Sequence, residues 1–258
     1  MAFRFHKHIV SALVIALLVG CSAEKRLDGP DFYEDGFENY TDLDELLLDD
    51  DVKWSFTQQT LSGNTITLDT SVVHSGQQSL RFSDVGTSGD VLSKCSIVKQ
   101  KMAFWEGETV YFSIWYYLEG EGNADWLFLV DLEEQIQIGA GPGMRLAIVS
   151  DSALVVEHKF PNPNIMQTSG NILAFPRNQW VHLEFETRLS QKEEGYVKVW
   201  QDDELILAQD NWQTLPKDIG PFMQGTKGMF SSIEIGLTAN PGANGHTLYA
   251  DDFLIERR

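Results

Sequence analysis

The chain has 258 residues, with 38 Asp or Glu against 19 Lys or Arg, so its formal net charge is −19. A surface of that sign repels nucleic acid phosphates and anionic lipid headgroups, so neither is expected as a direct partner. Binding of a polyanion would need a local basic patch or a bridging cation. The length is enough for one large domain with its own core.

The first 20 residues have the pattern of an export signal. Arg4 and Lys7 precede an almost wholly apolar run from residue 9 to residue 19. That run is shorter than the roughly 20 apolar residues of a membrane-spanning helix, and it fits the 7 to 15 or so that are typical of a signal core. Residues 1–20 are therefore predicted to be a signal peptide.

The residues that end this run, Leu18-Val19-Gly20-Cys21, resemble the lipobox of bacterial lipoproteins. The resemblance implies that Cys21 is acylated, that residues 21–31 are a tether, and that lipid alone holds the protein to the cell envelope. In this pattern an Asp directly after the cysteine favours the inner membrane, and other residues favour the outer one. Ser22 therefore favours the outer membrane. An ordinary cleaved signal is the alternative. With Cys21 acylated, Cys95 is the only thiol left, and no intrachain disulfide is expected.

Beyond residue 52 the sequence pattern is typical of a β protein. About ten short segments, such as "ETVYFSIWYYL" and "WVHLEFETRL", are rich in β-branched and aromatic residues and are separated by Gly, Pro, Asn and Asp. No segment keeps a helical period over several turns. Residues 32–258 are therefore predicted to form one all-β domain, a two-sheet sandwich or jelly roll.

Alternation in two segments predicts a polar, aromatic sheet face. Val181, Leu183 and Phe185 alternate with polar residues, and successive side chains of a strand point to opposite faces. Surfaces that combine aromatic rings with polar groups suit sugars. The predicted ligand-binding residues are His182, Glu184, Glu186, Arg188, Lys198, Trp200 and, outside these segments, Trp126. A solvated outer face is the alternative. Trp115 and Trp180 are expected in the core.

Four segments resemble, in order and spacing, polysaccharide lyases of the heparin-lyase-like and alginate-lyase-like group. They are "HSGQQSLRF", "GETVYFSIWYYL", "NQWVHLEFETRLSQKEEGYVKVWQDDELI" and "HTLYADDFLI". The resemblance implies a jelly roll of the concanavalin A type and a polysaccharide ligand. It also implies β-elimination on uronate polymers, which needs a group that neutralises the carboxylate, a base, and a Tyr that protonates the leaving oxygen.

Three motifs of this group are altered. An Arg-x-Glu strand is replaced by "SKCSIVKQK", with Lys94, Lys99 and Lys101. A Gln-x-His pair is replaced by Gln135 and Gln137, and a Lys-x-Gly-x-Tyr strand by "IEIGLTA", residues 233–239. We therefore expect polysaccharide binding in preference to elimination. If the protein is a lyase with relocated groups, the candidates are His158, His182, Tyr196, Lys198 and Gln137.

Two further functions remain open from the sequence. Asp131 and Glu133 are two residues apart in a predicted strand, so they share a face, and paired carboxylates serve glycoside hydrolysis. The Glu-x-Asp-x-x-Glu strand of the jelly-roll glucanases is missing, however. The third possibility is an envelope protein whose partner is not a carbohydrate.

A structural Ca²⁺ ion is implied by a second resemblance. Many carbohydrate-binding jelly rolls resemble this chain in a Phe-Glu near the first strand, a Ser-Gly-x-x-Ser-Leu loop and an Asp-Asp-Phe in the last strand. The matching ligands are Glu38, the backbone oxygens of Ser75 and Gly76, and Asp251 with Asp252 as neighbour. Oxygen ligands suit Ca²⁺. An ordinary acidic surface is the alternative.

Overall fold

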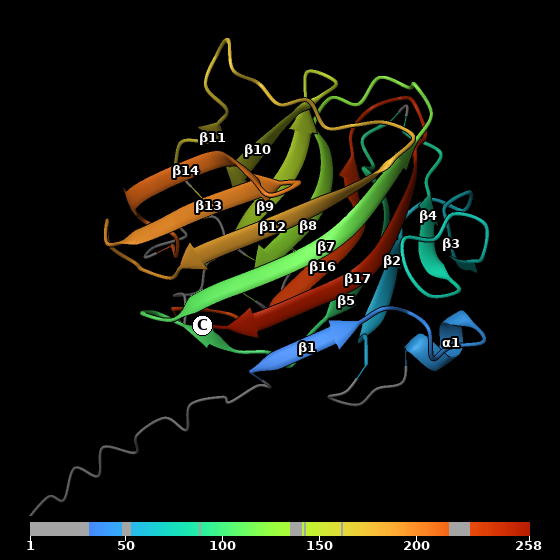
Figure 1. Ribbon diagram of the computed structural model, residues 1–258, viewed down its shortest axis with the longest axis horizontal. Helices are drawn as coiled ribbons and strands as arrows, with labels where there is room; N and C mark the ends of the chain where they lie inside the picture. Colours follow the sequence, from blue (N-terminus) through green and yellow to red (C-terminus); the bar gives the residue numbers. More distant parts are fainter. Residues whose placement is uncertain are drawn as a thin grey trace, which may run out of the picture.

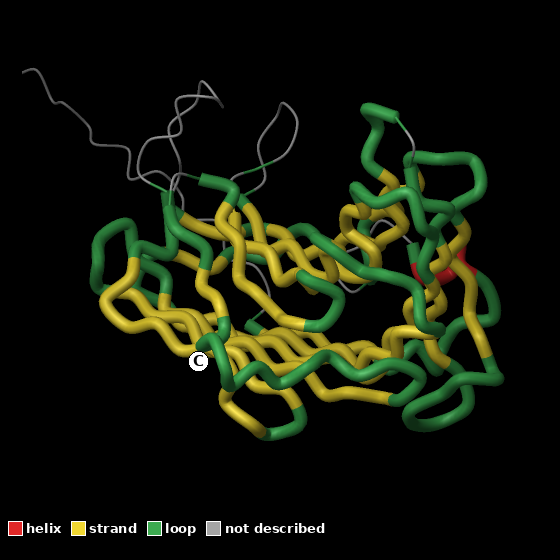
Figure 2. The backbone as a smooth tube through the Cα atoms, turned by 90° about the horizontal axis from the view of Figure 1, so that it is seen from above, coloured by secondary structure: helices red, strands yellow, loops and turns green. Residues whose placement is uncertain are grey.

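A computed structural model describes residues 31–47, 53–87, 89–134, 141, 143–160, 162–216 and 228–258. Cys21, Gln135 and Gln137 lie outside the described residues. Two large antiparallel sheets pack face to face, as Figures 1 and 2 show from two directions. The predicted all-β sandwich is thereby confirmed. Among the described residues, no helix is long and apolar enough to cross a membrane.

The sheet at the front of Figure 1 has eight strands, and its two longest strands pair at its centre. Its order is β14 (Glu204–Trp212), β13 (Gly195–Gln201), β12 (Trp180–Arg188), β7 (Thr109–Glu119), β17 (Thr247–Arg257), β4 (Ser79–Ser83) and β3 (Thr65–Asp69), with β1 (Phe32–Asp35) also paired to β17. The first and last strands of the domain therefore lie side by side.

The sheet behind it has seven strands. Its order is β11 (Ile165–Met166), β10 (Ala153–His158), β9 (Gly143–Val149), β8 (Leu127–Glu133), β16 (Ser232–Asn240), β5 (Ser93–Lys99) and β2 (Phe56–Gln59). Strands β6 (Phe104–Trp105) and β15 (Met229–Phe230) form a small third sheet, and α1 (Leu43–Leu46) is a short helix.

The core lies between the two large sheets because one face of each strand is apolar. In β12 the inward residues Val181, Leu183 and Phe185 are buried, and the Phe185 ring stacks on that of Phe112 in β7 at a centroid distance of 4.9 Å. Burying each such side chain contributes about 1.5 to 3 kcal/mol to folding. All nine residues of β16 are buried, so this strand has no face open to solvent.

The segment after β1 is anchored to the sandwich by one carboxylate. Asp35 accepts hydrogen bonds from the hydroxyl of Tyr40 at 2.8 Å and the indole of Trp54 at 2.9 Å, and from the backbone N–H of Phe37 at 2.8 Å. Trp54 is fully buried and packs against Phe253 of β17 at 5.2 Å between ring centroids. The segment consequently forms a wall beside the eight-stranded sheet.

Candidate functional site

Most of the predicted sugar-binding residues share the outer face of the eight-stranded sheet, the face turned away from the core. His182, Glu184 and Glu186 of β12 are half-buried there, and Glu184 pairs with Trp200 and Glu186 with Lys198 across to β13. Arg188 lies at the end of the same row and is exposed. Trp126 does not belong to this face, because it precedes β8 and packs against Phe128 of the other sheet.

Strand β7 adds a row of rings that the sequence analysis missed. The Trp115 ring lies between two imidazoles, 3.7 Å from His74 and 4.8 Å from His182 between ring centroids. Trp180 meets Tyr117 edge to face at 5.7 Å. The expectation that Trp115 and Trp180 lie in the core is wrong, because both are half-buried on the outer face of the sheet.

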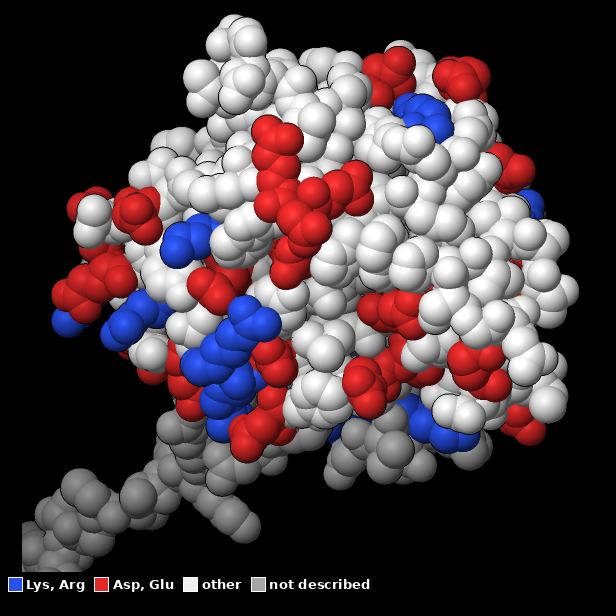
Figure 3. Space-filling model, viewed as in Figure 1, with Lys and Arg blue, Asp and Glu red and all other residues white. Residues whose placement is uncertain are grey.

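One ring of this row, Trp115, lines a cleft of about 740 Å³, which we call the aromatic cleft. Trp115, His182 and Ser113 line the floor, and Glu34 of β1 and Lys53 line the wall. Figure 3 shows this face of the molecule, on which acidic side chains form several groups and basic side chains gather mainly at the lower left. The cleft thus combines aromatic rings, hydroxyls and charges in an open space.

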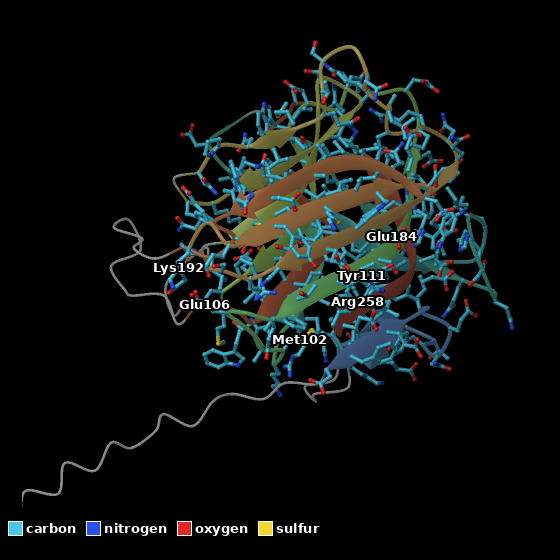
Figure 4. The ribbon with its side chains drawn as sticks, turned by 60° about the vertical axis from the view of Figure 1, so that its left-hand side comes forward. Met102, Glu106, Tyr111, Glu184, Lys192 and Arg258 are labelled. Atoms are coloured by element: carbon cyan, nitrogen blue, oxygen red, sulfur yellow. The ribbon has the colours of Figure 1, made fainter. Side chains whose placement is uncertain are left out.

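Two tyrosines on this face hydrogen-bond to carboxylates. Tyr111 donates to Glu184 at 2.5 Å, and Tyr196 donates to Glu186 at 2.9 Å. Burial, and then the hydrogen bond to Glu184, raise the pKa of Tyr111 to about 12, and burial also raises the pKa of Tyr196. Arg258 lies over the Tyr111 ring (Figure 4). Both hydroxyls are therefore protonated at neutral pH, so neither is a ready base.

The strands that carry two of the altered lyase motifs meet on the outer face of the seven-stranded sheet. Strand β16 lies between β5 and β8, with Gly236 opposite Ser96 and Glu234 opposite Asp131. Ser96 donates a hydrogen bond to Glu234, and Thr238 donates one to Asp131 at 3.0 Å. The residues at these positions already bind one another.

Lys159 completes a closed ionic network on this face. Its ammonium lies 2.5 Å from Asp131 and 2.7 Å from Glu133, and Lys94 lies 3.7 Å from Glu234. Asp131 and Glu234 are buried, and burial together with the charge of Asp131 raises the pKa of Glu234 to about 7. We call Asp131, Glu133, Lys159, Glu234 and Lys94 the ionic network. It contains neither a His nor a Tyr.

Other candidate groups for elimination are also engaged. His158 is buried, its Nδ1 lies 3.1 Å from the Pro163 carbonyl, and its Nε2 accepts from the Trp212 indole at 3.2 Å. Burial lowers the pKa of His158 to about 4, so it is neutral. Lys99 points away from the ionic network, donating to the Lys53 carbonyl at 2.6 Å and lying 4.4 Å from the Tyr33 ring centroid.

The residues of the predicted Ca²⁺ site surround one loop. Glu38 accepts from the backbone N–H groups of Gln77 and Gln78, and Asp251 accepts from those of His74 and Ser75. Asp252 accepts from the Ser75 hydroxyl at 2.9 Å. Burial, and then the charge of Asp252, raise the pKa of Asp251 to about 6. The loop thus meets Glu38 and Asp251 with its backbone N–H groups, and the His74 Nδ1 lies 2.7 Å from Asp252.

The fold defines a class of protein, the jelly-roll sandwiches to which several lyases belong. Three solved structures resemble the chain. An endo-β-1,4-glucuronan lyase from the fungus Trichoderma reesei has a TM-score of 0.63 and 14% identity, covering 79% of this chain and 90% of that one. Cellulose induced protein Cip1 has a TM-score of 0.61 and 18% identity, and the match covers 86% of this chain and 95% of that one. Alginate lyase Aly36B has a TM-score of 0.53 and 8% identity, and the match covers 88% of this chain and 97% of that one.

The family itself comes from the sequence. The family model "Polysaccharide lyase" matches residues 50–253, and the chain belongs to this family. No curated protein matches the chain. The resemblance noted from the four sequence segments is confirmed in its family and its fold.

Proposed function

We propose that this member of the polysaccharide lyase family binds polysaccharide on the outer face of its eight-stranded sheet and does not cut it by elimination. The observation that carries the proposal is the aromatic cleft, which places Trp115 and His182 beside the polar groups of β12. Sugars bind where rings cover their C–H faces and polar groups meet their hydroxyls. Trp200, on the neighbouring strand, is half-buried on the same face and pairs with Glu184, so it is the second ring that we propose as a sugar platform.

The ionic network supports binding rather than elimination. Lys159 and Lys94 are paired with carboxylates of the chain itself, so their charge is not available for a uronate. Asp131 and Glu234 are buried and have no access to a sugar C5 proton in this arrangement. Elimination needs a base within hydrogen-bond reach of that proton.

Lyase activity is the second candidate because the family match favours it. A lyase of this sequence would have to use a base outside the ionic network. His182 is a candidate, because neither nitrogen of its ring has a hydrogen-bond partner among the described residues. A glucanase-type hydrolase would need Asp131 and Glu133, which Lys159 already holds. The family match supports lyase activity at least as well as it supports binding alone, whereas the contacts of the ionic network favour binding.

One incubation with a panel of polysaccharides tests the proposal. The purified protein should be retained by at least one immobilised polysaccharide. The length of that polysaccharide should stay unchanged. A rise in the ultraviolet absorbance of unsaturated uronate would establish a lyase instead, and new reducing ends without that rise would establish a hydrolase. If no polymer is retained or cut, a non-carbohydrate partner replaces the proposal.

We also propose that the protein is an outer-membrane lipoprotein attached through Cys21. The support is the lipobox and Ser22 in the sequence, together with a net charge of −19 that disfavours direct contact with anionic lipid. Attachment through lipid alone would place the binding face at the envelope, where polymers are met.

A calcium ion at Glu38, Ser75, Gly76 and Asp251 is a further part of the proposal. Such an ion would join the loop before β4 to the last strand, so an ion that binds only the folded state should raise the midpoint of thermal unfolding. We expect Ca²⁺ to raise the midpoint, chelator to lower it, and Asp251→Asn to abolish the difference. Equal melting curves with Ca²⁺ and with chelator would contradict the proposed calcium site.

A further inference from the structure

We propose that His182, Glu184 and Asp203 bind a divalent transition-metal ion of the zinc type at the margin of the aromatic cleft. Each residue offers one ligand atom, and these atoms all lie within 4.8 Å of one another. One imidazole nitrogen and two carboxylate oxygens form a donor set that Zn²⁺ accepts. This site is separate from the predicted Ca²⁺ site at Glu38 and Asp251.

The backbone brings the three donors together. His182 and Glu184 are two residues apart in β12, so both project from the outer face. Asp203 lies in the hairpin that joins β13 to β14, and Asp202 fastens that hairpin to β12. The His182 N–H donates to the Asp202 carboxylate at 2.9 Å, and the Asp202 N–H donates to the His182 carbonyl at 2.9 Å. The backbone of the hairpin that carries Asp203 is therefore held beside His182 without a ligand.

The side chains are oriented and still have atoms to offer. The His182 ring lies 4.8 Å from that of Trp115 at an interplanar angle of 17°, and no described residue hydrogen-bonds to either ring nitrogen. Tyr111 donates to Oε1 of Glu184, which orients this carboxylate and leaves Oε2 for a metal. Carboxylates that bind a metal are characteristically held by such a hydrogen bond to the oxygen that does not bind it.

Charge separates this site from a second carboxylate cluster among the described residues. Asp131, Glu133 and Glu234 also lie within 4.8 Å of one another, but the Lys159 ammonium already lies against two of them. No described Lys or Arg forms an ion pair with Glu184 or Asp203, and Asp203 is exposed. A cation at His182, Glu184 and Asp203 would thus be the first positive charge in that cluster.

Three protein ligands leave a position open on a tetrahedral ion. That position faces the side of the sheet on which we propose that polysaccharide binds, beside Trp200, which pairs with Glu184. A carboxylate or hydroxyl of a sugar is the chemistry that would fill it. The ion would then bridge an acidic protein to an acidic polysaccharide. This bridging step rests on the proposed function, whereas the metal site does not.

Calorimetry with zinc, in the absence of polysaccharide, tests the metal site. The purified protein, stripped with chelator, is titrated with Zn²⁺ in buffer that contains Ca²⁺, so that the predicted calcium site is filled. We expect one zinc ion per chain. His182→Gln and Asp203→Asn should each weaken zinc affinity about 100-fold or more, because even changes behind the ligands cost about 10- to 100-fold. Asp210→Asn, which removes an exposed carboxylate from β14 of the same sheet, is the control and should bind zinc as the parent does.

Asn tolerates the left-handed backbone found at residue 203, where φ is 66°, so Asp203→Asn is expected to fold. No zinc binding, or equal affinity in the parent and both ligand variants, would overturn the site. Retention on a uronate polymer with and without zinc then tests bridging: we expect zinc to increase retention. Zinc binding with unchanged retention would overturn the bridge alone, and a protein that no polymer retains would overturn the proposed function while calorimetry still reports on the metal.

Discussion

Replacing Lys159 by Met is expected to lower the free energy of unfolding by about 3 to 5 kcal/mol, the usual cost of removing one partner from a buried ion pair. Lys159 has a side chain only 9% exposed, and its ammonium contacts Asp131 and Glu133. Met keeps most of the side-chain volume and removes the charge, so the buried Asp131 and the half-buried Glu133 would be left without their cation beside Glu234. Urea unfolding measures the change.

Two further variants separate charge from packing in this experiment. Lys192→Met removes an exposed ammonium and should change the free energy of unfolding by less than about 0.5 kcal/mol. Adding Asp131→Asn and Glu133→Gln to Lys159→Met should recover part of the loss, because the uncompensated charges are gone. If Lys159→Met unfolds at the urea concentration of the parent, the ionic network does not hold the seven-stranded sheet together.

Replacing Cys21 by Ser is expected to move the protein from the membrane fraction to the soluble fraction. A serine hydroxyl does not replace the thiol as the acceptor of diacylglycerol, and one short apolar run cannot hold the chain in a bilayer. Fractionation of cells followed by detection of the protein measures the effect. Within the lipoprotein pattern, Ser22→Asp should keep the protein lipidated and shift it toward the inner membrane. A Cys21→Ser protein that stays in the membrane fraction would contradict lipid attachment.

The sandwich and its polar face could be predicted because the period of a strand fixes both. Val181, Leu183 and Phe185 mark one face of β12, so His182, Glu184 and Glu186 must lie on the other. The same argument failed for Trp115. Strand β7 carries aromatic residues on both faces, so hydrophobicity alone does not tell its inward ring, Tyr116, from its outward ring, Trp115.

The ionic network could not be predicted as a unit. The spacing of Asp131 and Glu133 was its only local signal, whereas Lys159 and Glu234 reach the cluster through the order of strands in the sheet. Strand β16 reads "SIEIGLTAN" and is buried on both faces, so Glu234 is buried on the outer face of the seven-stranded sheet, against the usual preference of a carboxylate. Trp126 was grouped with Trp200 by its type, but the topology separates the two residues onto different sheets.

Retention of the Trp200→Ala variant on a polysaccharide that the parent binds tests the central claim most directly. If Trp200 is a sugar platform on the eight-stranded face, the variant should lose about 1 to 3 kcal/mol of binding free energy, measured by affinity electrophoresis. Trp126→Ala removes the same ring from the other sheet and should bind as the parent does. Weaker binding by Trp126→Ala with unchanged binding by Trp200→Ala, both variants being folded, would place the sugar on the opposite face and contradict the account.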